Sequence, residues 1–94
     1  MSNRDTYIHT LSLQLDELNA KMRVLDAKAH TLQAEAAAQY RSEMLKLHEQ
    51  SALAATKLKQ LRAAGEDSWD ELVAETEKVR DAFIHAFHYF KSQL

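Results

Sequence analysis

Residues that end a helix are almost missing from this chain. Its 94 residues include no proline and one glycine, Gly65. The remainder is rich in Ala, Leu, Glu, Lys and Gln, which are strong helix formers, so reverse turns have few residues to build them. The sequence therefore predicts an all-α protein. The length predicts a single helical coiled-coil domain, residues 1–94, with a modest core.

The clearest interruption is the segment RAAGEDSWDEL, residues 62–72. Gly65 can adopt the left-handed conformation that often follows a helix. Ser68 and Glu71 have the spacing of a capping box at a helix N-terminus. We therefore expect one helix to end near Ala64 and a shorter one to run over about residues 68–92.

The segment after this turn has apolar residues at steps of three and four, which is the spacing of an amphipathic helix. The seam and its flank consist of Trp69, Leu72, Val73, Thr76, Val79, Phe83, Ala86, Phe87, Phe90 and Leu94. A face this wide predicts packing against two neighbouring helices. The aromatic end is predicted to be core, and the alternative is an exposed docking patch for a protein or a membrane surface.

The segment before Gly65 carries a coiled-coil seam with the same spacing. Its middle, TLQAEAAAQY at residues 31–40, has nothing that turns a helix as Gly65 and Ser68 do, and alanine is the best helix former. We therefore predict one long helix over about residues 6–64. With the shorter helix it would make an antiparallel helical hairpin with coiled-coil packing. Three short helices folded back as a monomer are the alternative.

A helix of that length leaves the first half of its seam uncovered. It would be about 88 Å long, and the shorter helix would cover about 39 Å of it. Another chain is then needed to cover the leucines, and antiparallel self-pairing about Ala36 sets Leu11 opposite Leu61. The predicted assembly is an antiparallel homodimer or larger helical bundle. Its predicted interface comprises Leu11, Leu15, Leu18, Met22, Leu25, Leu32, Ala36, Tyr40, Leu47, Ala54 and Leu61.

Charge and hydropathy narrow the classes of partner. The formal net charge is −2 and residues 66–81 are strongly acidic, whereas a nucleic-acid partner selects a basic face. No apolar stretch approaches the roughly 20 residues of a membrane span, and the start, MSNRDTY, is not signal-like. The absence of cysteine excludes a disulfide framework and Cys-ligated zinc. These features predict a cytoplasmic protein that does not bind nucleic acid, and they disfavour a membrane as its partner.

Histidines offer the one candidate for a metal site. His85 and His88 lie three residues apart, and in the hairpin they would approach His48 and Glu43. Such a cluster could bind zinc, nickel or copper. Ordinary surface histidines are the favoured interpretation, because no H-E-x-x-H or E-x-x-H motif is present. No nucleophile–base pair or phosphate-binding loop stands out either, so we expect no cofactor and no enzymatic activity.

Several segments resemble a family of small bacterial coiled-coil proteins associated with stress responses, first noted in cyanobacteria. The segments are YIHTLSLQLDELNAKM, LDAKA and AATKLKQLRAAGEDSWDELVAETEKVRDAF, and KLKQLRAAGEDSWDEL is the most specific part. The similarity covers residues 7–87 and implies a small, stress-linked helical protein that is not an enzyme. The C-terminal segment HAFHYFKSQL departs from the family's pattern, which is consistent with a different partner.

Together these features predict a non-enzymatic, self-associating coiled-coil protein that acts as an interaction or stress-protective module. The partner is expected to be a second copy of the chain, with another protein as a further possibility. Three alternatives stay open at this point. One is a metal-binding helical protein that uses its histidines, and another is a membrane- or protein-docking factor that uses its aromatic C-terminal helix. The third is a secreted or periplasmic helper protein, which would need an export signal that the sequence does not show.

Overall fold

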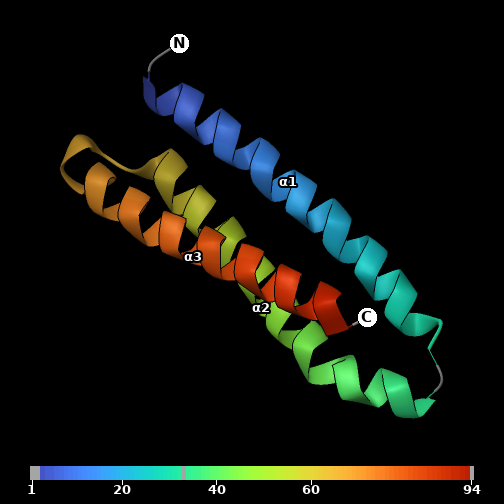
Figure 1. The fold of residues 1–94 in the computed structure, drawn as a ribbon. Helices are drawn as coiled ribbons and strands as arrows, with labels where there is room; N and C mark the ends of the chain where they lie inside the picture. The colour runs from blue at the N-terminus through green and yellow to red at the C-terminus, as the bar shows by residue number, and fades with distance from the viewer. Residues whose placement is uncertain (1–2, 33, 94) are drawn as a thin grey trace.

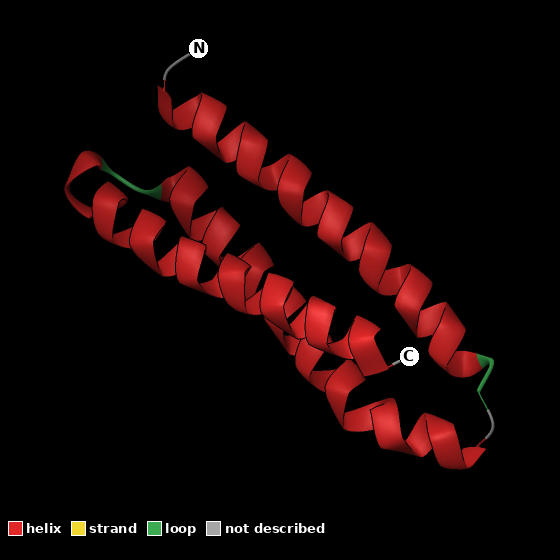
Figure 2. Ribbon diagram, in the orientation of Figure 1, coloured by secondary structure: helices red, strands yellow, loops and turns green. Residues whose placement is uncertain are grey.

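The protein folds as three helices. The computed structural model describes residues 3–32 and 34–93, and nearly all of them are helical. The helices are α1 (Asn3–His30), α2 (Ala34–Ala63) and α3 (Glu66–Gln93) (Figures 1 and 2). The described ranges contain no strand, which confirms the predicted all-α class.

The three helices lie side by side in an elongated body with extents of 50 × 20 × 18 Å. α2 and α3 run antiparallel: Lys57 Nζ lies 3.1 Å from Glu75 Oε2 near one end, and the Tyr40 hydroxyl donates to the Gln93 carbonyl near the other. α1 runs antiparallel to α2, so its N-terminal end lies beside the α2–α3 connection (Figure 1). Among the three helix pairs, α1 and α3 contact each other least.

The predicted single helix over residues 6–64 is wrong. α1 ends at His30 and α2 begins at Ala34, so the chain folds back within the segment that was expected to be continuous helix. The arrangement is the three-helix alternative. Of the predicted helical segment, residue 33 and the side chains of residues 34–37 lie outside the described residues.

Hydrogen bonds at the end of α1 help to explain the break. The amides of Thr31 and Leu32 donate to the carbonyls of Lys28 and Ala29 at 3.1 and 3.2 Å, three residues back rather than four. The Thr31 hydroxyl also donates to the Lys28 carbonyl at 2.7 Å. These bonds satisfy carbonyls that a helix end leaves free. Folding back also buries the leucine seam inside the same chain, and such packing commonly outweighs local helix propensity.

The predicted connection at Gly65 is present, but its local chemistry differs from the prediction. α3 begins at Glu66, two residues before the expected start at Ser68. No glycine or other residue in the described ranges has a positive φ, so Gly65 is not left-handed. It lies directly before α3, and the Ser68 amide and hydroxyl both donate to its carbonyl, at 3.3 and 3.4 Å. Glu66 and Asp67 in the first turn favour the earlier start, because negative charge meets the positive end of the helix dipole there.

The core is a continuous apolar cluster to which all three helices contribute. Its buried members are Leu11, Leu15, Met22, Leu25, Ala29, Leu47, Ala54, Leu58, Leu61, Phe83, Phe87 and Phe90. Phe90 is fully buried and stands edge-on to the Tyr40 ring, with a centroid distance of 6.0 Å. The prediction that Phe87 and Phe90 are core residues is confirmed, whereas Tyr89 between them is exposed.

The N-terminal end of α1 is held against the start of α3. The Arg4 guanidinium lies 4.4 Å from the centroid of the Trp69 ring and donates to the Ala64 carbonyl. Tyr7 stands edge-on to Trp69 at 5.8 Å and donates its hydroxyl to Glu77 Oε1 at 3.0 Å. Burial and this carboxylate raise the pKa of Tyr7 to about 12. These contacts fix α1 to α3 at one end.

Candidate functional site

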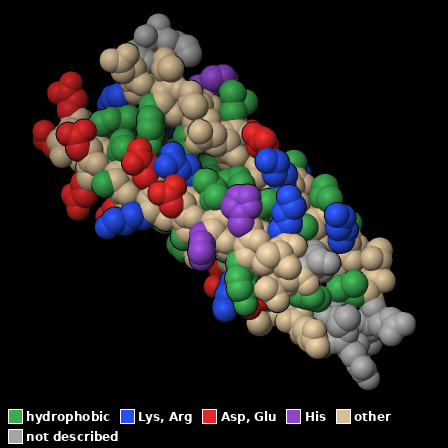
Figure 3. All heavy atoms as spheres, in the orientation of Figure 1, with side chains coloured by type: hydrophobic (Ala, Val, Ile, Leu, Met, Phe, Trp, Pro, Cys, Tyr) green, Lys and Arg blue, Asp and Glu red, His purple; other side chains and the backbone are tan. Residues whose placement is uncertain are grey.

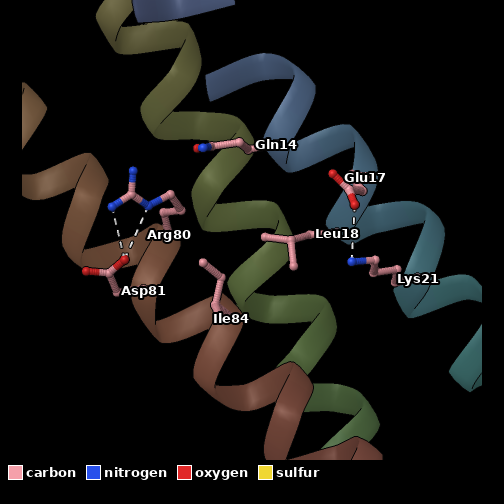
Figure 4. A pocket seen from close by; sticks show the side chains of 7 residues that line it. All are labelled: Gln14, Glu17, Leu18, Lys21, Arg80, Asp81 and Ile84. Carbon is pink, nitrogen blue, oxygen red and sulfur yellow. Dashed lines mark hydrogen bonds and ion pairs between the residues drawn. The ribbon is translucent and has the colours of Figure 1, made fainter. Parts of the chain in front are cut away.

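An open groove runs between α1 and α3. One hollow in it has a volume of about 360 Å³ and is shown in Figure 4. Its lining residues are Gln14, Glu17, Leu18, Lys21, Arg80, Asp81 and Ile84. A second hollow has a volume of about 310 Å³. Its lining residues are Lys21, Val24, Leu25, Lys28, Phe87, His88 and Lys91. Because both hollows include Lys21, we treat them as one feature, the α1–α3 groove.

The groove has an apolar floor. Leu18 of α1 and Ile84 of α3 extend toward each other across it (Figure 4), and both are half-buried. Further along, the floor is formed by the buried side chains of Leu25 and Phe87. Val24 beside them is 57% exposed. Water therefore reaches the aliphatic side chains of Leu18, Val24 and Ile84, above the buried Leu25 and Phe87. Exposed apolar side chains that lie together in a groove can mark a binding surface.

The length of the groove matches a short helix. On α1 it extends from Gln14 to Lys28, and on α3 from Arg80 to Lys91. At 1.5 Å per residue, the α1 side is about 21 Å long. That is about four helical turns, so a single amphipathic helix could lie along the whole groove.

Charge divides the groove into two halves. In the first half each charge is balanced, because Glu17 pairs with Lys21 at 3.2 Å and Asp81 pairs with Arg80 at 3.1 Å. The second half is lined by basic residues and no acidic ones.

Two of the basic groups in the second half form no ion pair with any residue that the structure describes. Among residues 3–32 and 34–93, no ion pair involves Lys28 or Lys91. Figure 3 shows Lys, Arg and His side chains along this face, whereas acidic side chains gather near the α2–α3 connection. The second half of the groove is therefore an apolar strip with an excess of positive charge.

The sequence-predicted metal candidates are dispersed. His48 pairs with Asp26 of α1, with 2.8 Å between Nε2 and Oδ2, and Glu43 pairs with Lys46 at 3.7 Å. His85 and His88 are exposed on α3. Within the described ranges, no three His, Asp or Glu side chains come together in a group that could hold a metal ion.

The residues predicted to form a dimer interface lie mostly inside one chain. Seven of them are buried: Leu11, Leu15, Met22, Leu25, Leu47, Ala54 and Leu61. Leu18, Leu32 and Tyr40 are half-buried, and the side chain of Ala36 lies outside the described residues. Leu11, Leu15 and Leu25 of α1 are buried within the same chain. The uncovered seam from which the dimer was inferred is therefore not present in this fold, and the homodimer stays a prediction.

Sequence reasoning missed the groove and most of its residues. The signal that could have found it is Val24, an apolar residue that lies outside the seam, with Lys21 and Lys28 three before it and four after it. That spacing places all three on one face of α1. The seam residues alone could not indicate it, because the groove depends on how closely α1 approaches α3.

Comparisons of the chain with protein-family models, with curated proteins and with solved structures find no match. None of the helices in the described ranges is long and apolar enough to cross a membrane. The function is therefore argued from the geometry and chemistry of the α1–α3 groove.

Proposed function

We propose that this chain is a non-enzymatic interaction module that holds an amphipathic helix of a partner protein in the α1–α3 groove. The observation that carries the proposal is the apolar floor formed by Leu18, Ile84 and Phe87 between two charged rims. Amphipathic helices bind such grooves through apolar residues at i, i+3 or i+4, and i+7. A bound helix would complete a four-helix arrangement and bury the floor.

The charges on the rim indicate the chemistry of the partner helix. Lys28 and Lys91 stand at the second half of the groove without a carboxylate partner in the described ranges. A helix that carries Glu or Asp beside its apolar stripe would place those carboxylates near the two lysines. Charge complementarity of this kind favours the correct partner and its orientation, and speeds association. The proposed partner is therefore an acidic amphipathic helix.

The wider role remains part of the same proposal. The resemblance noted in the sequence points to a stress-linked protein, and a helix-binding groove would let such a protein cover exposed helices of other chains. A cytoplasmic location and the absence of catalysis belong to this proposal as well. Because α3, the aromatic C-terminal helix, forms one side of the groove, this proposal extends the earlier alternative of a protein-docking factor. It does not extend the alternative of a metal-binding protein.

A binding titration tests the proposal. The probe is a labelled model helix of about 14 residues with leucines at i, i+3, i+4 and i+7 and glutamates on both flanks. We expect saturable binding that weakens at high salt. Replacing the glutamates by lysines should weaken binding, because Lys28 and Lys91 of the groove would then repel the peptide.

Two variants locate the binding. Ile84→Asp introduces a charge into the floor and should weaken binding by about tenfold or more, since a charge buried without a partner is costly. Leu53→Asp is the control, because it places the same charge on another aliphatic residue that is 47% exposed and does not line the groove. Circular dichroism verifies that both variants fold. Equal binding by the two variants, or no binding of the acidic helix by the wild type, would contradict the proposal.

A further inference from the structure

The contacts between α1 and α2 are arranged about the connection that joins them. Arg4 of α1 donates to the carbonyl of Ala64, just after α2. The Ser51 hydroxyl donates to Asn19 Oδ1, and His48 pairs with Asp26 at 2.8 Å. The midpoints of these pairs fall at residues 34, 35 and 37, close to the connection. If α1 and α2 became one straight helix, two such helices running antiparallel could therefore form the same pairs between chains.

The sequence of the connection is compatible with a continuous helix. Residues 31–33 are Thr, Leu and Gln, with no glycine or proline, and the alanine-rich start of α2 follows. Gln33, the residue before α2, is not among the side chains that cap a helix N-terminus well. By contrast, the connection before α3 contains Gly65. The first connection therefore carries little in its sequence that opposes straightening.

A continuous helix would replace the backbone hydrogen bonds at the end of α1. The Lys28 and Ala29 carbonyls now accept bonds from the Thr31 and Leu32 amides, three residues on, whereas the first amides of α2 have no partner within their own helix. Fusing the helices would join these groups in i to i−4 bonds. The apolar seam continues through the connection as well, because Ala29, Leu32, Ala36 and Tyr40 follow one another at steps of three and four.

We propose that two copies of this chain dimerise by exchanging α1. The connection straightens, α1 and α2 fuse into one helix over residues 3–63, and α1 of each copy packs against α2 and α3 of the other. The contacts that Arg4 and Tyr7 make with Trp69 and Glu77 are then made between copies. Leu11, Leu15 and Leu25 of α1 likewise enter the core of the other copy. The exchange keeps the interface that the single chain already has, which is why such swaps are a low-cost route to dimers.

The exchanged dimer differs from an association of two closed chains. The closed chain is 50 Å in its longest dimension, whereas the fused helix would be about 90 Å long. Each dimer would contain two α1–α3 grooves, each built from two chains. The inference goes beyond the proposed function and does not rest on it, because a groove is present whether or not the exchange occurs.

Cysteine cross-linking tests the exchange directly, since the natural chain contains no cysteine. The reporting variant carries Asn19→Cys and Ser51→Cys, one on α1 and one on α2. The control variant carries Lys57→Cys and Glu75→Cys, which join α2 to α3. Both proteins are concentrated, treated with a short bismaleimide and separated on a denaturing gel. Their masses before treatment are measured by light scattering.

The proposal predicts a dimer by light scattering, with different cross-links in the two variants. The reporting pair should link two chains covalently, whereas the control pair should link positions within one chain. A monomeric mass together with a cross-link inside one chain for the reporting pair would overturn the proposal. So would a dimeric mass with a reporting cross-link inside one chain, because the dimer would then consist of closed chains.

Two more variants test the exchange without relying on the Asn19→Cys and Ser51→Cys pair. Asp26→Cys with His48→Cys probes the same α1–α2 interface at a second place and should also link two chains. Leu32→Gly with Gln33→Gly should favour the closed monomer. Each glycine lowers the equilibrium constant for forming the continuous helix by about threefold. A dimer contains four such glycines, so its dissociation constant should rise by roughly 100-fold. An unchanged dissociation constant would contradict a hinge at this connection.

Discussion

Phe90 provides the most demanding test of the packing in this fold. Its side chain is fully buried and stands edge-on to Tyr40 at a centroid distance of 6.0 Å. Phe90→Ala removes the buried ring and leaves a cavity, which typically costs about 3–5 kcal/mol in free energy of unfolding. A domain of this size has a total stability of about 5–14 kcal/mol. The variant should therefore lose a large share of it.

A denaturant melt followed by circular dichroism measures this loss. Tyr89→Ala is the matched control, because Tyr89 is the neighbouring aromatic residue and is 49% exposed. We expect the control to stay within about 1 kcal/mol of the wild type. In thermal melts, Phe90→Ala should lower Tm by at least about 12 °C. A loss of less than about 1 kcal/mol in the free energy of unfolding for Phe90→Ala, or an equal loss in the two variants, would contradict tight packing around Phe90.

Three further predictions concern the ends and surfaces of the helices. Tyr7→Phe should cost about 1–2 kcal/mol near pH 7, because it removes the hydrogen bond to the Glu77 carboxylate. The raised pKa of Tyr7, about 12, stabilises the folded protein fully below pH 10, the ordinary value. This contribution is lost between about pH 10 and 12, so melts across that range should show a smaller loss in Tyr7→Phe than in the wild type. Gly65→Ser should raise the free energy of unfolding by about 0.5–1 kcal/mol, because serine caps the N-terminus of α3 better than glycine and makes the unfolded chain less flexible. The added Cβ has room, since no neighbouring atom lies within 4 Å of it. A lower melting midpoint would argue against Gly65 as the cap of α3. His48→Ala should cost less than about 1 kcal/mol despite the contact with Asp26, because His48 is half exposed, and a larger loss in a urea melt would contradict this.

The second half of the chain was predictable because its signals are local. Gly65 and the acidic residues after it mark a helix boundary, and the three–four spacing from Trp69 to Phe90 marks a buried face. The structure places both as expected, apart from the earlier start of α3 and the conformation of Gly65. Patterns within a few residues were sufficient for this part of the fold.

The fold-back after α1 was not predictable in the same way. The bonds of Thr31 and Leu32 to Lys28 and Ala29 are available in principle to any helix with this sequence. They form here because folding back buries Leu11, Leu15 and Leu25 of α1 inside the chain. That gain involves residues far apart in the chain, so a reading of local propensity favoured the long helix. The groove was missed for a related reason, since it depends on the distance between two helices.

The most direct test of the proposed function is a map of the bound helix on the protein. Isotope-labelled protein is titrated with the acidic amphipathic model helix, and backbone amide shifts are followed by NMR. The account predicts that the largest changes fall in residues 14–28 and 80–91, the two sides of the α1–α3 groove, and that Ile84→Asp suppresses them. Changes confined to the outer face of α2, or no changes at saturating peptide, would contradict the claim that this groove is the binding site.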